Sequence, residues 1–140
     1  MQPELKIEIT AKPKSDEEKY IRQQINQFNQ HCAGEENYQH LAVFLRDCDR
    51  LVGGLVGYTY WQWLYVDVFW IQESYRKGGY GSAMLAAAEA EAIQRGCHSV
   101  YLGTYSFQAP EFYQKLGYAV FGELPNFPEG QSLFFLTKTL

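Results

Sequence analysis

The stretch that most constrains the fold is VFWIQESYRKGGYGSAML, residues 68–85. An apolar run rich in β-branched and aromatic residues, typical of a strand, is followed by three glycines within four positions and then by an alanine-rich helical pattern. A glycine loop between a strand and a helix presents unpartnered backbone N–H groups and the positive end of the helix dipole, which together bind anions. Gly78, Gly79 and Gly81 let an anion approach these amides because they lack Cβ atoms.

The anion expected at this loop is a pyrophosphate that is not part of NAD. Arg76 and Lys77 add two cations at the mouth of the loop. Glycines here can also form only a tight turn, but three within four residues are more than a turn requires. A P-loop is excluded because the sequence holds no GxxxxGK[ST]. A dinucleotide fingerprint needs a glycine at Met84 and an acidic residue about 20 positions on, where residues 101–105 carry no carboxylate.

Hydrophobic periodicity predicts strands and helices along the rest of the chain. Strands are expected over residues 5–9, 40–46, 50–60, 63–71, 99–105, 118–122 and 132–138. Helices are expected from a capping box at Ser15 to before Gly34, over residues 80–95, and within APEFYQKLGY. The second helix should bury a face formed by Met84, Leu85, Ala88, Ala92 and Ile93. This order predicts an α/β (α+β) fold, a mixed, mostly antiparallel sheet with helices on both faces, in a single domain of residues 1–140.

Composition and charge exclude several classes of protein. The net charge is −4 and the chain has no run of five Lys or Arg, so we expect no nucleic-acid partner and a preference for cationic ligands. The three cysteines lack CxxC spacing, which fits reduced thiols in the cytoplasm. We expect no membrane segment, because no apolar stretch approaches about 18 residues. The three histidines lie in separate elements, so we expect no metal site.

The loop and a second segment together resemble a known family. Residues 68–85 resemble the acetyl-CoA motif of the GNAT superfamily of N-acetyltransferases, a hydrophobic strand followed by [QR]-x-x-G-x-[GA], matched by Arg76, Gly79 and Gly81. APEFYQKLGY is similar to the family's second signature, A-x-x-x-Y-x-x-x-G-[FY], matched by Ala109, Tyr113, Gly117 and Tyr118. The order of the predicted elements also agrees with this family over nearly the whole chain.

The resemblance implies acetyl-CoA as the donor substrate and assigns residues to it. Backbone groups of Phe69 and Ile71 would pair with the pantetheine arm as an added strand, where their strand splays from the one holding Tyr101, and Trp70 between them is also a cofactor-binding candidate. The pyrophosphate would be held by Arg76, Lys77, Gly78, Gly79, Tyr80, Gly81 and Ser82. Ser106 stands where the family often has an asparagine, so it is a candidate contact that can make only part of an amide's hydrogen bonds.

Transfer to an amine needs a base for the amine and an acid for the leaving thiolate. The resemblance places Tyr113 near the sulfur as the acid, although a tyrosine here can also simply pack beside Phe112. Asp67 is the candidate base; the alternative is a solvated strand residue with a water relay serving instead. Glu73 is a weaker candidate that can equally pair with the neighbouring cations of the loop.

The acceptor is expected to be a small, cationic amine. The hairpin near the expected slot is crowded with rings that attract ammonium groups, namely Tyr58, Tyr60, Trp61, Trp63 and Tyr65. The same rings can instead fill the core or a homodimer interface. The leading hypothesis is therefore an acetyl-CoA-dependent N-acetyltransferase, and the alternative is a non-catalytic acyl-CoA-binding or sensor module of the same fold.

Overall fold

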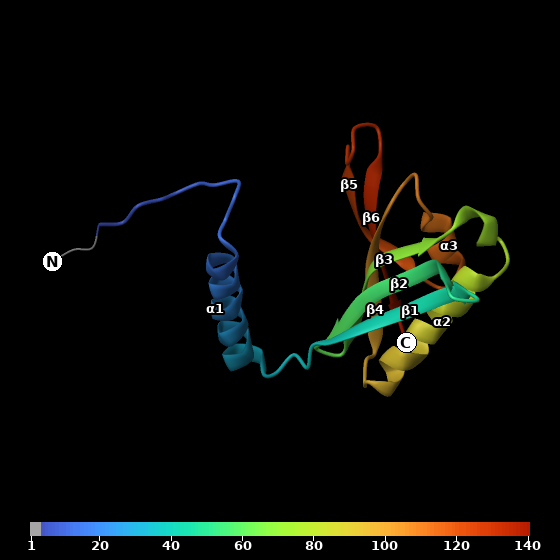
Figure 1. Cartoon of the computed structure of the whole chain (residues 1–140), viewed down its shortest axis with the longest axis horizontal. Coiled ribbons are helices and arrows are strands. Elements are labelled where there is room, and N and C mark those ends of the chain that lie inside the picture. The colour runs from blue at the N-terminus through green and yellow to red at the C-terminus, as the bar shows by residue number, and fades with distance from the viewer. Residues whose placement is uncertain (1–3) are drawn as a thin grey trace. The chain divides into compact units, whose positions relative to one another are not determined.

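A computed structural model describes residues 4–140 of the chain and divides it into two units, Met1–Glu35 and Glu36–Leu140. The first unit contains one long helix, α1 (Ser15–Ala33), drawn in blue in Figure 1. Gly34 follows it with a φ of 81°, and its backbone N–H donates to the carbonyl of Gln30 at 2.8 Å. The predicted first helix is therefore confirmed. The prediction of a single domain over residues 1–140 stays a prediction, and residues 1–3 lie outside the described part.

Two predictions about the first unit are wrong. Residues 4–10 form no regular secondary structure, although residues 5–9 alternate as a strand would. A strand needs a neighbour that takes its backbone hydrogen bonds, and alternation alone does not supply one. The capping box at Ser15 is also not formed: Lys14 is the N-cap residue, and among the described residues no side chain caps the helix. The acidic first turn instead stabilises this end through the helix dipole.

Within residues 36–140, six strands form one sheet in the order β1-β2-β3-β4-β6-β5. The strands are β1 (Gln39–Asp47), β2 (Arg50–Tyr60), β3 (Trp63–Ile71), β4 (Ser99–Tyr105), β5 (Ala119–Pro125) and β6 (Ser132–Thr139). Neighbours pair antiparallel except β3 and β4, which are parallel and joined through helix α2 (Tyr80–Gln94). The predicted mixed, mostly antiparallel sheet is confirmed.

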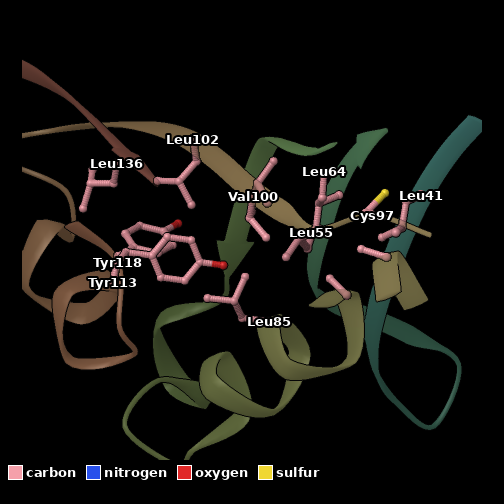
Figure 2. Packing of buried hydrophobic residues seen from close by; sticks show 13 residues of the cluster. Leu41, Leu55, Leu64, Leu85, Cys97, Val100, Leu102, Tyr113, Tyr118 and Leu136 are labelled. Carbon is pink, nitrogen blue, oxygen red and sulfur yellow. The ribbon is translucent and has the colours of Figure 1, made fainter. Parts of the chain in front are cut away.

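Helices α2 and α3 (Pro110–Lys115) contribute to one hydrophobic core with the sheet. Figure 2 shows Leu85 of α2 and Tyr113 of α3 among the leucines and valines of β2, β3, β4 and β6. The predicted buried face of α2 is confirmed except at Ile93, which is 55% exposed. Ile93 follows the buried Ala92, and one helical step turns the side chain about 100° away from it. Helices on both faces of the sheet stay a prediction, because α1 belongs to the other unit.

Strand β3 contains a β-bulge at Asp67 that shapes the site. Val56 pairs with Val68 but Gly57 pairs with Val66, so Asp67 is the extra residue. Only glycine fits at position 57, because a Cβ there would overlap the carbonyl oxygen of Tyr65. The bulge shifts the alternation of β3 by one residue and bends the strand. Pairing of β3 with β4 ends at Val66, immediately before the bulge, so the two strands separate from that point.

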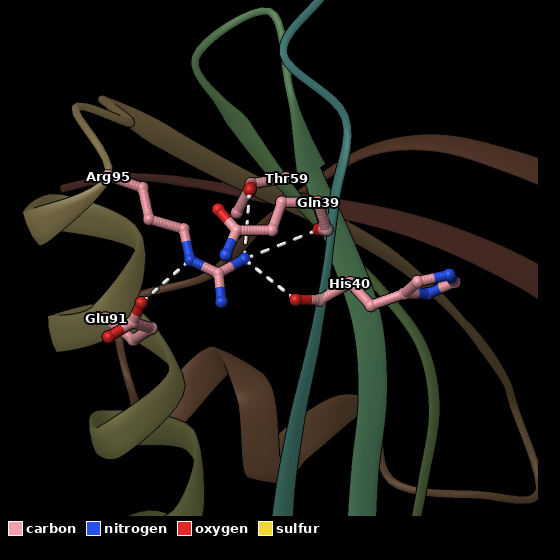
Figure 3. A network of polar contacts seen from close by, with 5 residues as sticks. All are labelled: Gln39, His40, Thr59, Glu91 and Arg95. Atoms are coloured by element: carbon pink, nitrogen blue, oxygen red, sulfur yellow. Dashed lines mark hydrogen bonds and ion pairs between the residues drawn. The ribbon is translucent and has the colours of Figure 1, made fainter.

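The C-terminal end of α2 is tied to the sheet by Arg95 (Figure 3). Its Nε donates to the Glu91 carboxylate at 2.7 Å, and its Nη1 donates to the carbonyl of His40 at 3.0 Å and to the hydroxyl of Thr59 at 3.2 Å. These bonds join α2 to β1 and β2. They therefore fix the C-terminal end of α2, the helix whose N-terminal end follows the glycine loop.

Candidate active site

The slot between β3 and β4 exposes one edge of the β3 backbone. Gln72 N–H donates to Val52 on β2 at 2.7 Å, so the backbone groups of Gln72 and Trp70 point toward β2. Alternate residues of an antiparallel strand point their N–H and C=O groups to opposite edges. Phe69 and Ile71 therefore face the slot, where pairing with β4 has ended. This edge can accept an added strand-like ligand, whereas the backbone of Trp70 is turned away from it.

The glycine loop has the backbone conformation of an anion-binding turn. Lys77 and Gly79 adopt left-handed φ angles of 65° and 85°. The N terminus of α2 begins directly after Gly79, and within residues 4–140 no side chain caps it. Its first N–H groups are therefore available to an anion. The preceding segment is tethered through the Tyr75 hydroxyl, which donates to the carboxylate of Asp47 at the tip of the first hairpin.

A cavity of about 440 Å³, here called the loop cavity, lies against this turn. The predicted site residues that line it are Phe69, Ile71, Arg76, Lys77, Gly79, Gly81, Ser82 and Tyr113. A Cβ at Gly81 would lie 3.2 Å from Cζ of Phe112, so glycine keeps this wall open. No described carboxylate lines the loop cavity. Two cations, helix N–H groups and a missing Cβ fit the pyrophosphate of a CoA molecule.

A second cavity of about 710 Å³, here called the slot cavity, follows the separation of β3 and β4. The predicted site residues that line it are Asp67, Phe69, Trp70, Ile71, Arg76 and Tyr113. Both cavities are lined by Phe69, Ile71 and Tyr113, so they are adjacent. The structure thus brings Asp67, from the bulge, and Tyr113, from α3, to one cavity.

Tyr113 is a buried phenol at the junction of the two cavities. Its residue is 8% exposed, and burial raises the pKa of its hydroxyl to about 12. The hydroxyl is therefore protonated at neutral pH and can donate a proton. Its ring packs edge-on against Phe112 at 5.1 Å and Tyr118 at 5.8 Å between ring centroids. These contacts fix the direction of the side chain.

Four predicted candidates lie outside both cavities in the described part of the chain: Gly78, Tyr80, Ser106 and Glu73. The Ser106 hydroxyl donates to the Gln131 side chain at 2.6 Å and accepts from the Ser132 N–H at 3.0 Å, so it joins β4 to β6. Sequence reasoning missed Thr104, which is buried and lines the slot cavity, and Phe112 of the loop cavity. The only signal in the sequence for Thr104 is the alternation of β4, which places it on the same face as Val100 and Leu102.

The aromatic residues of the second hairpin gather on the sheet face opposite the core. Tyr58 and Tyr60 flank the buried Thr59, and Trp63 and Tyr65 flank the buried Leu64, so alternation directs them away from the core. Burial, followed by the charge of Asp67, raises the pKa of Tyr65. The Asp67 carboxylate, two positions after Tyr65 in β3, is thus close enough to this ring to act on it.

Two features are absent from residues 4–140, the part of the chain that the structure describes. No helix in this range is long and apolar enough to span a membrane. No three His, Cys, Asp or Glu side chains in this range are grouped so that they could hold a metal ion.

Comparison with known proteins agrees with this geometry. A model described as the acetyltransferase (GNAT) family matches residues 4–118. Blasticidin-S acetyltransferase of Streptomyces morookaense is 44% identical over 92 residues, 65% of this chain and 68% of that protein. A crystal structure of an acetyltransferase from Agrobacterium tumefaciens superposes with a TM-score of 0.91 at 32% identity, covering 97% of this chain and 100% of that one. An aminoglycoside 6'-N-acetyltransferase in complex with coenzyme A superposes with a TM-score of 0.63 at 25% identity, covering 71% and 72%.

The chain belongs to the GNAT family of acetyltransferases, because the family model matches most of its length. It is therefore an acetyl-CoA-dependent N-acetyltransferase by family. The predictions of the family, of an acetyltransferase and of acetyl-CoA as the donor are confirmed.

Proposed function

We propose that the protein transfers an acetyl group from acetyl-CoA to the primary amine of a small, cationic molecule by direct attack in a ternary complex. The observation that carries the proposal is that Asp67 and Tyr113, from separate elements, line the same slot cavity. A base for the incoming amine and an acid for the departing thiolate are what direct transfer requires.

The donor side of the proposal rests on the loop cavity. Backbone N–H groups of Gly79 to Ser82 and the side chains of Arg76 and Lys77 would hold the pyrophosphate. The slot-facing backbone of Phe69 and Ile71 would hold the pantetheine arm, which brings the thioester into the slot cavity. Arg76 supports this edge, because its Nε donates to the carbonyl of Ile71 at 2.8 Å. That bond leaves the Ile71 N–H for the ligand.

The acceptor side rests on Asp67. A free alkylamine has a pKa of about 10.4, so near pH 7 its extra proton must be removed before its nitrogen can attack the thioester carbonyl. The Asp67 carboxylate, directly or through one water, would accept this proton. The backbone N–H group of Phe69, which is nearer the bulge, would stabilise the negative charge that develops on the carbonyl oxygen, while the Ile71 N–H and the Phe69 carbonyl hold the pantetheine arm.

The transfer then finishes at Tyr113. The new C–N bond forms, the C–S bond breaks, and the Tyr113 hydroxyl would donate its proton to the thiolate before regaining one from solvent. Its pKa of about 12, raised by burial, keeps the hydroxyl protonated until the C–S bond breaks. A thiolate with a conjugate-acid pKa near 8.5 is a weaker base than the phenolate, so full proton transfer from Tyr113 is uphill. The hydroxyl would therefore act first as a hydrogen-bond donor to the sulfur as negative charge develops there, and solvent would replace any proton that it transfers.

A small cationic amine is the acceptor class that the observations favour. Two similar proteins are named for acetylating blasticidin S and aminoglycosides. The aromatic face beside Asp67 and the net charge of −4 both attract cations. We also expect the protein to work in the cytoplasm, where its free cysteines Cys32, Cys48 and Cys97 would stay reduced; a homodimer stays a prediction.

The experiment that tests the proposal is thiol release from acetyl-CoA across a panel of small amines. We expect release that depends on the acceptor and saturates with its concentration. An Asp67→Asn variant should lose most of this rate near pH 7 and recover part of it above pH 9, where more amine is already neutral. Tight CoA binding without turnover for any amine would instead support the non-catalytic acyl-CoA-binding module.

A further inference from the structure

A third cavity, of about 460 Å³, lies beside the turn between β2 and β3 and is here called the aromatic cavity. The described residues that line it are Tyr60, Trp61, Trp63, Tyr101, Phe121 and Thr137. All but Thr137 are aromatic, and none of these described residues carries a charge. They come from β2, the turn after it, β3, β4, β5 and β6, so every strand of the sheet except β1 contributes.

The rings of the aromatic cavity are held in place by one another. The hydroxyls of Tyr60 and Tyr101 share a hydrogen bond across the intervening strand β3. Tyr101 lies over Tyr65 with ring centroids 4.8 Å apart, and Trp63 meets Tyr101 edge-on at 5.9 Å. A ligand would therefore find the wall already formed, which lowers the cost of ordering these side chains on binding.

The position of Trp61 is maintained against local strain. Trp61 and Gln62 form the two-residue turn of the hairpin with φ angles of 42° and 65°. Such a turn normally holds Asn-Gly or a similar pair, because a bulky residue at positive φ is disfavoured by about 1–3 kcal/mol. Hydrogen bonds from the Trp61 N–H to Glu36 at 2.8 Å and from the His98 N–H to Gln62 at 2.9 Å lock the turn. Strain of this kind is typical of a functional position.

The aromatic cavity lies within reach of the slot cavity along one sheet face. Tyr101 lines the aromatic cavity, and Gly103 of the same strand lines the slot cavity. These two residues are separated by one position, so they point to the same face and lie about 7 Å apart along β4. A molecule that carries a cationic group a few bonds away from its primary amine can therefore touch both cavities.

We infer that the aromatic cavity binds a cationic group of the acceptor that is remote from the amine to be acetylated. The inference rests on the proposed function. It names the chemical group of the acceptor, other than the reacting amine, that the protein recognises. Each aromatic face attracts a cation by about 0.5–2 kcal/mol. Because no described carboxylate lines the cavity, attraction comes from the ring faces, which favour weakly hydrated cations such as guanidinium over a compact ammonium.

The test compares two acceptors that share a primary amine: agmatine, with a guanidinium at its far end, and hexylamine, with a methyl group there. In the variant Trp61→Gly we expect the KM for agmatine to rise about tenfold or more, because one good cation–π contact with the guanidinium is lost. The KM values for hexylamine and for acetyl-CoA should stay within about twofold. The melting temperature should not fall, because glycine relieves the strain at this turn.

Two controls make the result specific. Trp61→Asn keeps a side chain that tolerates the turn, and it should lose agmatine recognition as Trp61→Gly does. Phe44→Ala removes an exposed ring of β1 that does not line the aromatic cavity, and it should leave all three KM values unchanged. An equal rise for agmatine and hexylamine, or no rise for either, would overturn the inference.

Binding without turnover separates this inference from the proposed function. Agmatine added without acetyl-CoA should shift the indole N–H signals of Trp61 and Trp63 in an NMR titration, and hexylamine should not. Unmoved signals, or equal shifts with hexylamine, would overturn the subsite. Shifts specific to agmatine in a protein that acetylates no amine would support the subsite and contradict the proposed transfer.

Discussion

Tyr113 combines the two properties that a proton donor to the thiolate needs, a fixed position and a hydroxyl that stays protonated. We predict that Tyr113→Phe lowers kcat by about 10²-fold and leaves the affinity for acetyl-CoA within about twofold. Steady-state rates together with calorimetric titration of CoA would check both numbers. Tyr38→Phe, at an exposed position just before β1, is the matched control and should behave as wild type. A kcat that is unchanged in Tyr113→Phe would return this residue to a packing role.

Gly81 tests the pyrophosphate side of the site. A Cβ at this position would lie 3.2 Å from the Phe112 ring, and an aspartate would place a negative charge in the anion site. We predict that Gly81→Asp abolishes measurable CoA binding. Gly122→Asp adds the same charge in β5, where a Cβ would meet Phe135 at an ordinary 3.7 Å, and it should bind CoA normally. Retained CoA affinity in Gly81→Asp would refute the assignment of the loop.

For individual residues, the sequence predicts the acetyl-CoA site better than the site of the acceptor amine. Arg76, Gly79 and Gly81 could be recognised because a short loop carries the whole pattern. The role of Ser106 could not be predicted, because its hydrogen bonds to Gln131 and to Ser132 at the start of β6 depend on strand pairing. The meeting of Asp67 and Tyr113 likewise depends on the sheet and α3, which no local pattern specifies.

At the scale of elements, the bulge in β3 is the feature that opens the slot. Gly57 allows it, because any side chain there would overlap the carbonyl of Tyr65. We predict that Gly57→Ala lowers the free energy of unfolding by about 3 kcal/mol or more, since the neighbouring backbone has no space to relax. Gly122→Ala should change it by less than about 1 kcal/mol. Urea unfolding of both variants checks this, and equal stabilities would contradict the role given to Gly57.

Strand and helix positions were largely predictable, whereas the bulge was not. The strands over 63–71 and 99–105 carry β-branched and aromatic residues in short runs, and the structure places them at those bounds. The bulge arises from the register between β2 and β3, which no local sequence pattern specifies. Residues 5–9 show the opposite error, because alternation without a neighbouring strand does not form a strand.

At the scale of the whole molecule, buried tyrosines make stability depend on alkaline pH. Burial raises the pKa of Tyr113 to about 12, and burial with the hydrogen bond to Glu89 raises the pKa of Tyr118 further. These groups stay protonated in the folded state while the unfolded chain ionises near pH 10, so their contribution is complete below pH 10 and is lost as pH rises through the folded values.

We therefore predict that the free energy of unfolding falls above pH 10, by about 1.4 kcal/mol per pH unit for each such tyrosine. Urea unfolding between pH 8 and 11 measures the slope. Tyr113→Phe should reduce that slope, and Tyr38→Phe, at an exposed position of the same unit, should not. A flat profile to pH 11 in the wild type would contradict the burial of these hydroxyls.

The order of elements was enough to predict the mixed sheet, and the two signatures were enough to predict the family. The acceptor could not be predicted from the sequence, because its proposed recognition involves rings that four strands and one turn bring together. Rings spaced along a hairpin can equally fill a core, and only the pairing of β3 with β4 and of β4 with β6 shows that they line a cavity.

We expect acetyl-CoA to lie along the slot between β3 and β4, with its reacting end between Asp67 and Tyr113. A crystal structure with CoA bound tests it most directly. We expect the pyrophosphate on the amides of residues 76–82, the pantetheine arm along Phe69 and Ile71, and the sulfur within about 3.2 Å of the Tyr113 hydroxyl. CoA bound elsewhere, or with its sulfur facing away from Tyr113, would contradict the account.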